Sequence, residues 1–159
     1  MVIIKNFLDK KFFNSFFNDL NSSSFPWFFR DHQVGDYDKP YFTHSFYNKR
    51  VTSSGFDLHI VPILEKLKCV QPVEIRANLV LNYNKHFISA FHTDTKLKCK
   101  TAILYMNNCD GYTIIDDKEV KCEKNKIVIF DSTIKHAGVS QTNTEKRIVL
   151  NLNYFDLNE

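Results

Sequence analysis

Glycine and proline are both scarce in this chain, with 4 of each among 159 residues. Such a composition excludes collagen-like and low-complexity proteins. The charge excess is also small, because 21 basic residues oppose 18 acidic ones and leave a formal net charge of +3. A charge this mild does not indicate a nucleic-acid partner. The 15 phenylalanines and 7 tyrosines supply ample apolar bulk for a folded core, which argues against disorder.

Cysteine and long apolar runs are also in short supply. The four cysteines form no C-x-x-C pair and stand at no zinc-finger spacing relative to the histidines. We therefore interpret them as reduced thiols and expect a cytoplasmic protein. No apolar run has the length of a signal peptide or a membrane-spanning helix, so we expect no membrane association.

The length favours one domain, which we place over residues 1–159. Residues 1–71 are expected to be helical N-terminal support. Apolar residues recur at helical spacing after the candidate N-cap Asn6 and predict a helix that ends near residues 21–24. A second helix is expected after Ser54, with Pro62 kinking or restarting it. Residues 25–50 show no clean period.

From about residue 72 the pattern alternates between apolar and polar residues, which predicts β-strands. We expect strands over residues 73–83, 99–107, 111–115, 126–130 and 146–155. Helices precede strands, and no crossover helix follows residue 72. This order predicts an α+β fold, mostly β, with a largely antiparallel sandwich or barrel over residues 72–155.

Two histidines and an aspartate offer metal-binding chemistry. His92 and Asp94 are two residues apart, and on a strand such side chains point the same way, so they can hold one ion. His136 follows a short apolar strand and would supply a third ligand. Two imidazoles and one carboxylate bind one face of Fe(II) and leave its other positions open.

Residues suited to a dicarboxylate lie on two predicted strands. Arg147 begins a polar strand face that continues to Asn153. A solvent-facing strand face is the simplest interpretation of this pattern, and we apply it to Asn153. An arginine directed into a barrel instead needs an anion to pair with. Tyr105 and Ile103 share a strand face. If the anion is a dicarboxylate, Tyr105 can donate its hydroxyl to the carboxylate that pairs with Arg147, while Ile103 packs on the methylenes of the ligand. Tyr105 as an ordinary core residue is the competing interpretation.

The ordered set of His92-x-Asp94, His136 and Arg147 resembles the Fe(II)- and 2-oxoglutarate-dependent dioxygenases, and most closely their prolyl-hydroxylase-like branch. The stretches TAILYMNNCDGYTIID and FDSTIKHAGVSQTNTEKRIVLNLNYF carry this resemblance. The segments PWFFRD, FTHSFYN and RANL resemble small oxygenases encoded by bacteriophages. The resemblance implies a double-stranded β-helix, or jelly roll, over residues 72–155, with the N-terminal helices packed on one sheet. It also implies a location in the host cytoplasm.

The resemblance further implies roles for individual residues. His92, Asp94 and His136 would bind iron, and Arg147 with Tyr105 and Ile103 would bind the far end of 2-oxoglutarate. Either Asn78 or Tyr83 would steady its near end. The two would face opposite ways on a regular strand, so both assignments stay open.

The implied reaction converts 2-oxoglutarate and O2 to succinate while an unidentified substrate is hydroxylated, with ascorbate as a further candidate cofactor. A protein or peptide side chain is one candidate substrate, and residues 25–50 and 84–91 are expected to border the site. Asp94 favours hydroxylation or demethylation, because halogenating relatives replace this carboxylate. Two alternatives remain: a nucleic-acid demethylase, for which the lysines are too dispersed, and a non-catalytic metal-binding jelly roll.

Overall fold

The computed structural model describes residues 1–35 and 38–157 and contains two antiparallel sheets. The large sheet has the strand order β1 (Val2–Ile4), β9 (Lys126–Asp131), β6 (Lys100–Tyr105), β11 (Lys146–Asp156), β5 (Cys69–Leu81), β3 (Tyr41–Asn48) and β2 (Phe28–Arg30), and β4 (Val51–Thr52) pairs with β3. The small sheet has the order β10 (His136–Val139), β7 (Tyr112–Ile115) and β8 (Lys118–Lys121). The predicted fold is confirmed: it is α+β, mostly β, with a jelly-roll architecture.

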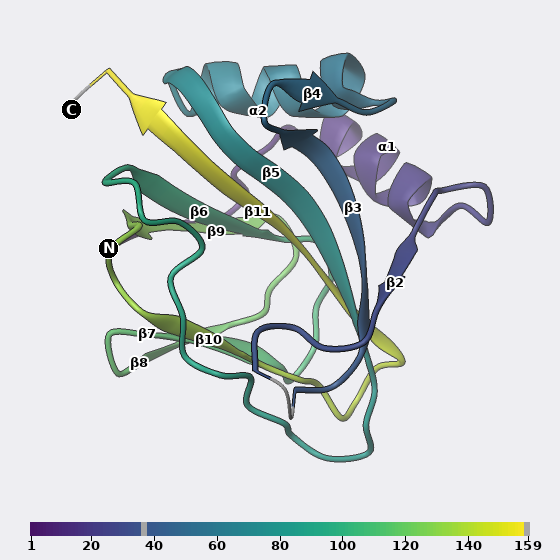
Figure 1. Cartoon of the computed structure of the whole chain (residues 1–159). Coiled ribbons are helices and arrows are strands. Elements are labelled where there is room, and N and C mark those ends of the chain that lie inside the picture. The colour runs from purple at the N-terminus through teal and green to yellow at the C-terminus, as the bar shows by residue number, and fades with distance from the viewer. Residues whose placement is uncertain (36–37, 158–159) are drawn as a thin grey trace.

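The helices cover one face of the large sheet, and the small sheet lies across the other (Figure 1). They are α1 (Lys10–Asn21), a π-helical segment η1 (Phe56–Ile60) and α2 (Val61–Lys66). Phe16 of α1 and Ile63 of α2 are fully buried in one apolar cluster with the outer face of the sheet. Among the described residues, no helix combines the length and the apolar character needed to cross a bilayer.

Strand alternation separates a helix-facing side from an inward side. On β11, Ile148, Leu150 and Leu152 pack with the helices. Val149 instead packs with Tyr105 in a second cluster between the two sheets. Side chains of the large sheet that share the direction of Val149 therefore point into the space between the sheets, where the candidate site lies.

The prediction that residues 1–71 are helical support is incomplete, because this segment also supplies β1, β2, β3 and β4. β3 lies inside the large sheet beside β5, so its side chains are partly buried on both faces and lack a clean period. The helix cap also differs from the prediction. Asp9, not Asn6, accepts hydrogen bonds from the backbone of Lys11 and Phe12, because the helix begins at Lys10 and Asp9 directly precedes it.

Pro62 lies in the first turn of α2, directly after η1, so the second helix restarts there as predicted. The predicted strands all form, with shifted ends. β5 runs from Cys69 to Leu81, which leaves Tyr83 beyond its end. The short strands β8 and β10 were not predicted.

Candidate active site

His92 and His136 lie directly opposite each other at the edge of the small sheet. The backbone N–H of His92 donates to the carbonyl of His136 at 3.0 Å, and the reverse hydrogen bond measures 2.9 Å. Opposed residues of an antiparallel pair project their side chains to the same face. The two imidazole rings accordingly lie side by side, with centroids 4.6 Å apart.

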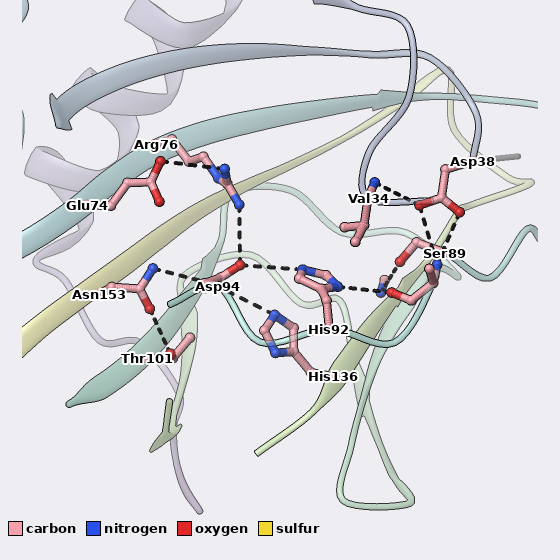
Figure 2. Close-up of polar contacts among 12 residues, drawn as sticks. Val34, Asp38, Glu74, Arg76, Ser89, His92, Asp94, Thr101, His136 and Asn153 are labelled. Atoms are coloured by element: carbon pink, nitrogen blue, oxygen red, sulfur yellow. Dashed lines mark hydrogen bonds and ion pairs between the residues drawn. The ribbon is translucent and has the colours of Figure 1, made fainter. Parts of the chain in front are cut away.

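Asp94 completes a cluster of three metal-ligating side chains (Figure 2). Its Oδ1 lies 3.4 Å from His92 Nε2, and its Oδ2 lies 3.8 Å from His136 Nε2. One ligand atom from each residue falls within 4.8 Å of the others. Two imidazoles and one carboxylate fit a divalent iron centre, and the three are close enough to share one ion.

Hydrogen bonding and burial favour the anionic form of Asp94 and the neutral form of His136. Burial raises the pKa of Asp94, but the hydrogen bond with His92 and the charges of His136 and Arg76 outweigh it, so the pKa falls well below its usual range. His92 Nδ1 lies 2.9 Å from the Ala90 carbonyl, which can only accept, so Nδ1 carries the proton and Nε2 faces Asp94. Burial lowers the pKa of His136 and favours its neutral, metal-binding form.

Arg147 is a buried cation on the inward side of β11, with only 4% of its surface exposed. Its Nη2 donates to Thr113 Oγ1 at 2.9 Å and to the Tyr112 carbonyl at 3.4 Å, while its Nε has no hydrogen-bond partner. Among the described residues, none supplies a carboxylate that forms a salt bridge with Arg147. A buried guanidinium with an unused donor is suited to an anionic ligand.

Thr113 links Tyr105 to this arginine. The Tyr105 hydroxyl donates to Thr113 Oγ1 at 2.9 Å, and burial raises the pKa of Tyr105 to about 12, so this donor stays protonated. Thr113 Oγ1 thus accepts from both Arg147 and Tyr105. Its own hydroxyl proton is left to donate toward a bound anion.

One cavity joins the histidines to Arg147. Its walls come from the inward faces of both sheets and from the segments before β3 and before β6. The lining residues are Gln33, Val34, Tyr41, Arg76, Asn78, Val80, Ser89, His92, Ile103, Thr113, His136, Gly138, Arg147, Val149 and Asn151. The cavity therefore offers metal ligands and an anion-binding cation to a single ligand.

Of the remaining predicted site residues, two line the cavity and two do not. Asn78 and Ile103 line the cavity. Tyr105 does not; it lies behind Thr113 and is fully buried. Tyr83 also lies outside the lining, and its hydroxyl donates to the carbonyl of Pro40. The geometry thus favours Asn78 over Tyr83.

Several lining residues were not named from the sequence. Gln33, Val34 and Tyr41 come from residues 25–50, and Ser89 from residues 84–91, the two segments expected to border the site. Thr113 could have been identified from the sequence as a candidate site residue, because it is a polar side chain within the largely apolar strand predicted over residues 111–115. The interpretation that Asn153 faces solvent is wrong. Asn153 is 2% exposed, and its Nδ2 lies 3.4 Å from Asp94 Oδ2.

No protein-family model and no curated protein matches this chain. Solved structures do match it. A prolyl-4-hydroxylase from Pseudomonas putida has a TM-score of 0.69 at 12% identity, with 98% of this chain and 91% of that chain covered. A Trichoplax adhaerens prolyl hydroxylase, bound to a peptide fragment of the hypoxia inducible factor, has a TM-score of 0.66 at 14% identity, with 98% and 83% covered.

The epimerase SnoN of nogalamycin biosynthesis, in complex with Fe3+ and alpha ketoglutarate, has a TM-score of 0.68 at 12% identity, with 98% of this chain and 78% of that chain covered. At these identities the likeness establishes a shared fold. A shared fold does not fix the activity, which depends on the residues of the site itself.

Proposed function

We propose that this protein is an Fe(II)- and 2-oxoglutarate-dependent dioxygenase that hydroxylates an as yet unidentified substrate. One observation carries the proposal: a single cavity is lined by His92, His136 and the buried Arg147, and Asp94 lies close enough to both histidines to share a metal ion with them. A metal site alone would suit a binding protein. The added buried cation, without a carboxylate partner among the described residues, suits a ligand that is anionic at one end and reaches the metal at the other.

Iron would be held by His92, Asp94 and His136. When bound, it supplies the redox chemistry by which 2-oxoglutarate and O2 give succinate and CO2 while the substrate gains a hydroxyl group. The protein residues bind and orient the reactants. Arg147 and the hydroxyl of Thr113 would bind the far carboxylate of 2-oxoglutarate, and Tyr105 would hold Thr113 in place.

The walls between these two ends suit the rest of the cosubstrate. Ile103 and Val149 line the cavity from β6 and β11, and their apolar side chains would pack on its methylenes and exclude water. Asn78 would donate its amide to the near end. Thr43 Oγ1 lies 3.0 Å from Asn78 Oδ1 and holds that side chain on the inward face of β5.

The proposed outcome is hydroxylation. The carboxylate of Asp94 argues against halogenation, and the structural neighbours include both hydroxylases and an epimerase, so the fold does not decide the outcome. A peptide side chain is a candidate substrate, since one neighbour holds a peptide fragment. Ascorbate dependence, a cytoplasmic location and a phage origin stay predictions.

The test is succinate production. Purified protein with Fe(II), 2-oxoglutarate and O2 should form succinate slowly even without a primary substrate, as measured by NMR. The Asp94→Ala variant should lose this activity. Glu119→Ala, altered on the exposed face of β8, is the matched control and should retain it. Equal succinate formation by wild type and Asp94→Ala would overturn the proposal.

A further inference from the structure

Two donors from the large sheet contact the carboxylate of Asp94, which lies outside the regular strands and has a fully buried side chain (Figure 2). Arg76 Nη2 of β5 lies 3.3 Å from Asp94 Oδ1, and Asn153 Nδ2 of β11 lies 3.4 Å from Asp94 Oδ2. Each oxygen thus has its own donor. A carboxylate oxygen has about two acceptor positions, so one position on each oxygen is left for another partner.

Thr101 determines which way the amide of Asn153 points. Thr101 and Asn153 are directly paired across β6 and β11, and the Thr101 hydroxyl donates to Asn153 Oδ1 at 2.7 Å. Thr101 is 0% exposed and Asn153 is 2% exposed, so water does not compete for these groups. With its oxygen held by Thr101, Asn153 must present its NH2 group to Asp94 and not a second acceptor.

We infer that Thr101 and Asn153 are positioning residues that orient the Asp94 carboxylate toward His92 and His136 for metal binding. This inference rests on the proposed metal centre. Asp94 lies in a segment without a strand's backbone pairing, so side-chain contacts have to fix its direction. Groups that orient metal ligands in this way commonly change metal affinity by 10–100-fold when removed.

Arg76 holds the other side of the carboxylate but is a less clean probe. It also faces Glu74 at 3.6 Å and carries a charge that repels a bound cation. Its removal would combine a loss of orientation with a gain in electrostatic attraction. Thr101 and Asn153 are both uncharged, so substitutions there leave the charge beside the metal ligands unchanged.

The test measures Co(II) binding, which needs neither 2-oxoglutarate nor turnover. Co(II) is titrated into wild type, Thr101→Val, Thr101→Ser and Asn153→Leu, and the visible absorption of the bound ion reports its coordination. We expect Thr101→Val and Asn153→Leu each to weaken Co(II) affinity about 10–100-fold and to alter the spectrum. Thr101→Ser keeps the hydroxyl and should stay within about 3-fold of wild type.

A double-variant cycle separates positioning from general damage to the core. If Thr101 acts through Asn153, the variant carrying both Thr101→Val and Asn153→Leu should bind Co(II) no more weakly than Asn153→Leu alone. Thermal unfolding of the metal-free proteins reports any structural cost. Should Thr101→Val lower the unfolding temperature while leaving Co(II) affinity and spectrum unchanged, the inference is overturned.

His136→Ala distinguishes this failure from failure of the proposed function. If His136→Ala abolishes Co(II) binding but Thr101→Val and Asn153→Leu do not affect it, only the positioning role is wrong. If wild type and His136→Ala bind Co(II) equally, the metal centre itself is wrong and the positioning role falls with it.

Discussion

His92 and His136 exchange both backbone hydrogen bonds across an antiparallel bridge, at 3.0 and 2.9 Å. This pairing brings together two residues that are far apart in the sequence. It also makes their side chains share one face, with Asp94 two residues further along the same segment. The candidate metal centre is therefore fixed by backbone pairing for two of its ligands and by side-chain contacts for the third.

Replacing Arg147 should separate cosubstrate binding from metal binding. Arg147→Met removes the only cation that we place at the far carboxylate, so affinity for 2-oxoglutarate should fall at least about 100-fold, in line with loss of a buried charged hydrogen bond. Metal affinity should change less than about 3-fold. Calorimetric titration of 2-oxoglutarate into the Co(II)-loaded protein measures the first, and Co(II) titration the second.

The same Arg147→Met variant should not destabilise the ligand-free protein, because a buried guanidinium that forms no salt bridge with a carboxylate of residues 1–35 or 38–157 is replaced by an apolar side chain of similar length. Thermal unfolding checks this. Equal losses of metal and 2-oxoglutarate affinity would contradict the role assigned to Arg147.

Asn78 and Tyr83 should differ in their effect on 2-oxoglutarate. Asn78 lines the cavity, whereas the Tyr83 hydroxyl is engaged by the Pro40 carbonyl outside it. We expect Asn78→Ala to weaken 2-oxoglutarate binding about 5–10-fold, which corresponds to one hydrogen bond. Tyr83→Phe should leave it unchanged. A larger loss in Tyr83→Phe than in Asn78→Ala would reverse the assignment.

Gly111 supports Arg147 by having no side chain. A Cβ at Gly111 would lie 2.9 Å from the Val139 carbonyl oxygen and 3.0 Å from Arg147 Cδ. Gly111→Ala should therefore lower the free energy of unfolding by about 1–3 kcal/mol and weaken 2-oxoglutarate binding.

Gly138→Ala is the matched control for stability, because its Cβ would lie 3.6 Å from Arg147 Nη1 and 3.8 Å from Ser89 Oγ, at ordinary contact distances. Denaturant unfolding compares the two variants. Equal stability of Gly111→Ala and wild type would show that the turn relaxes without cost.

His59 should make the fold less stable in mild acid. Burial lowers the pKa of His59 below its ordinary value of 6.5, with Asp19 opposing the shift. The unfolded chain then binds a proton at a higher pH than the native protein does. The free energy of unfolding should therefore fall as the pH drops below about 6.5. In His59→Gln this pH dependence should be shallower, as denaturant unfolding between pH 7.5 and about 5 will show. An unchanged dependence would contradict the assignment.

Alternation predicted the strands, because it is a local property of a strand. His92, Asp94 and His136 were singled out by residue type and by the family resemblance, and the strand rule does not explain their cluster, because Asp94 lies outside the regular strands. The sequence patterns did not predict β8 and β10, because their sequences, KEVK and HAGV, lack the apolar run that marked the equally short β7, YTII. Asn153 shows a second limit. A polar residue on a strand was taken to face solvent, but β11 is covered on both faces, and the polar partner that Asn153 meets comes from a distant segment.

The most direct test of the account is an anaerobic titration of the metal-free protein with Fe(II) and then with 2-oxoglutarate, followed by visible absorption. We predict the weak charge-transfer band of the iron–2-oxoglutarate chelate in the wild type. Its loss is expected in His92→Ala, and a much higher 2-oxoglutarate requirement in Arg147→Met. Iron binding without any such band would contradict the account and indicate a metal-binding jelly roll without this chemistry.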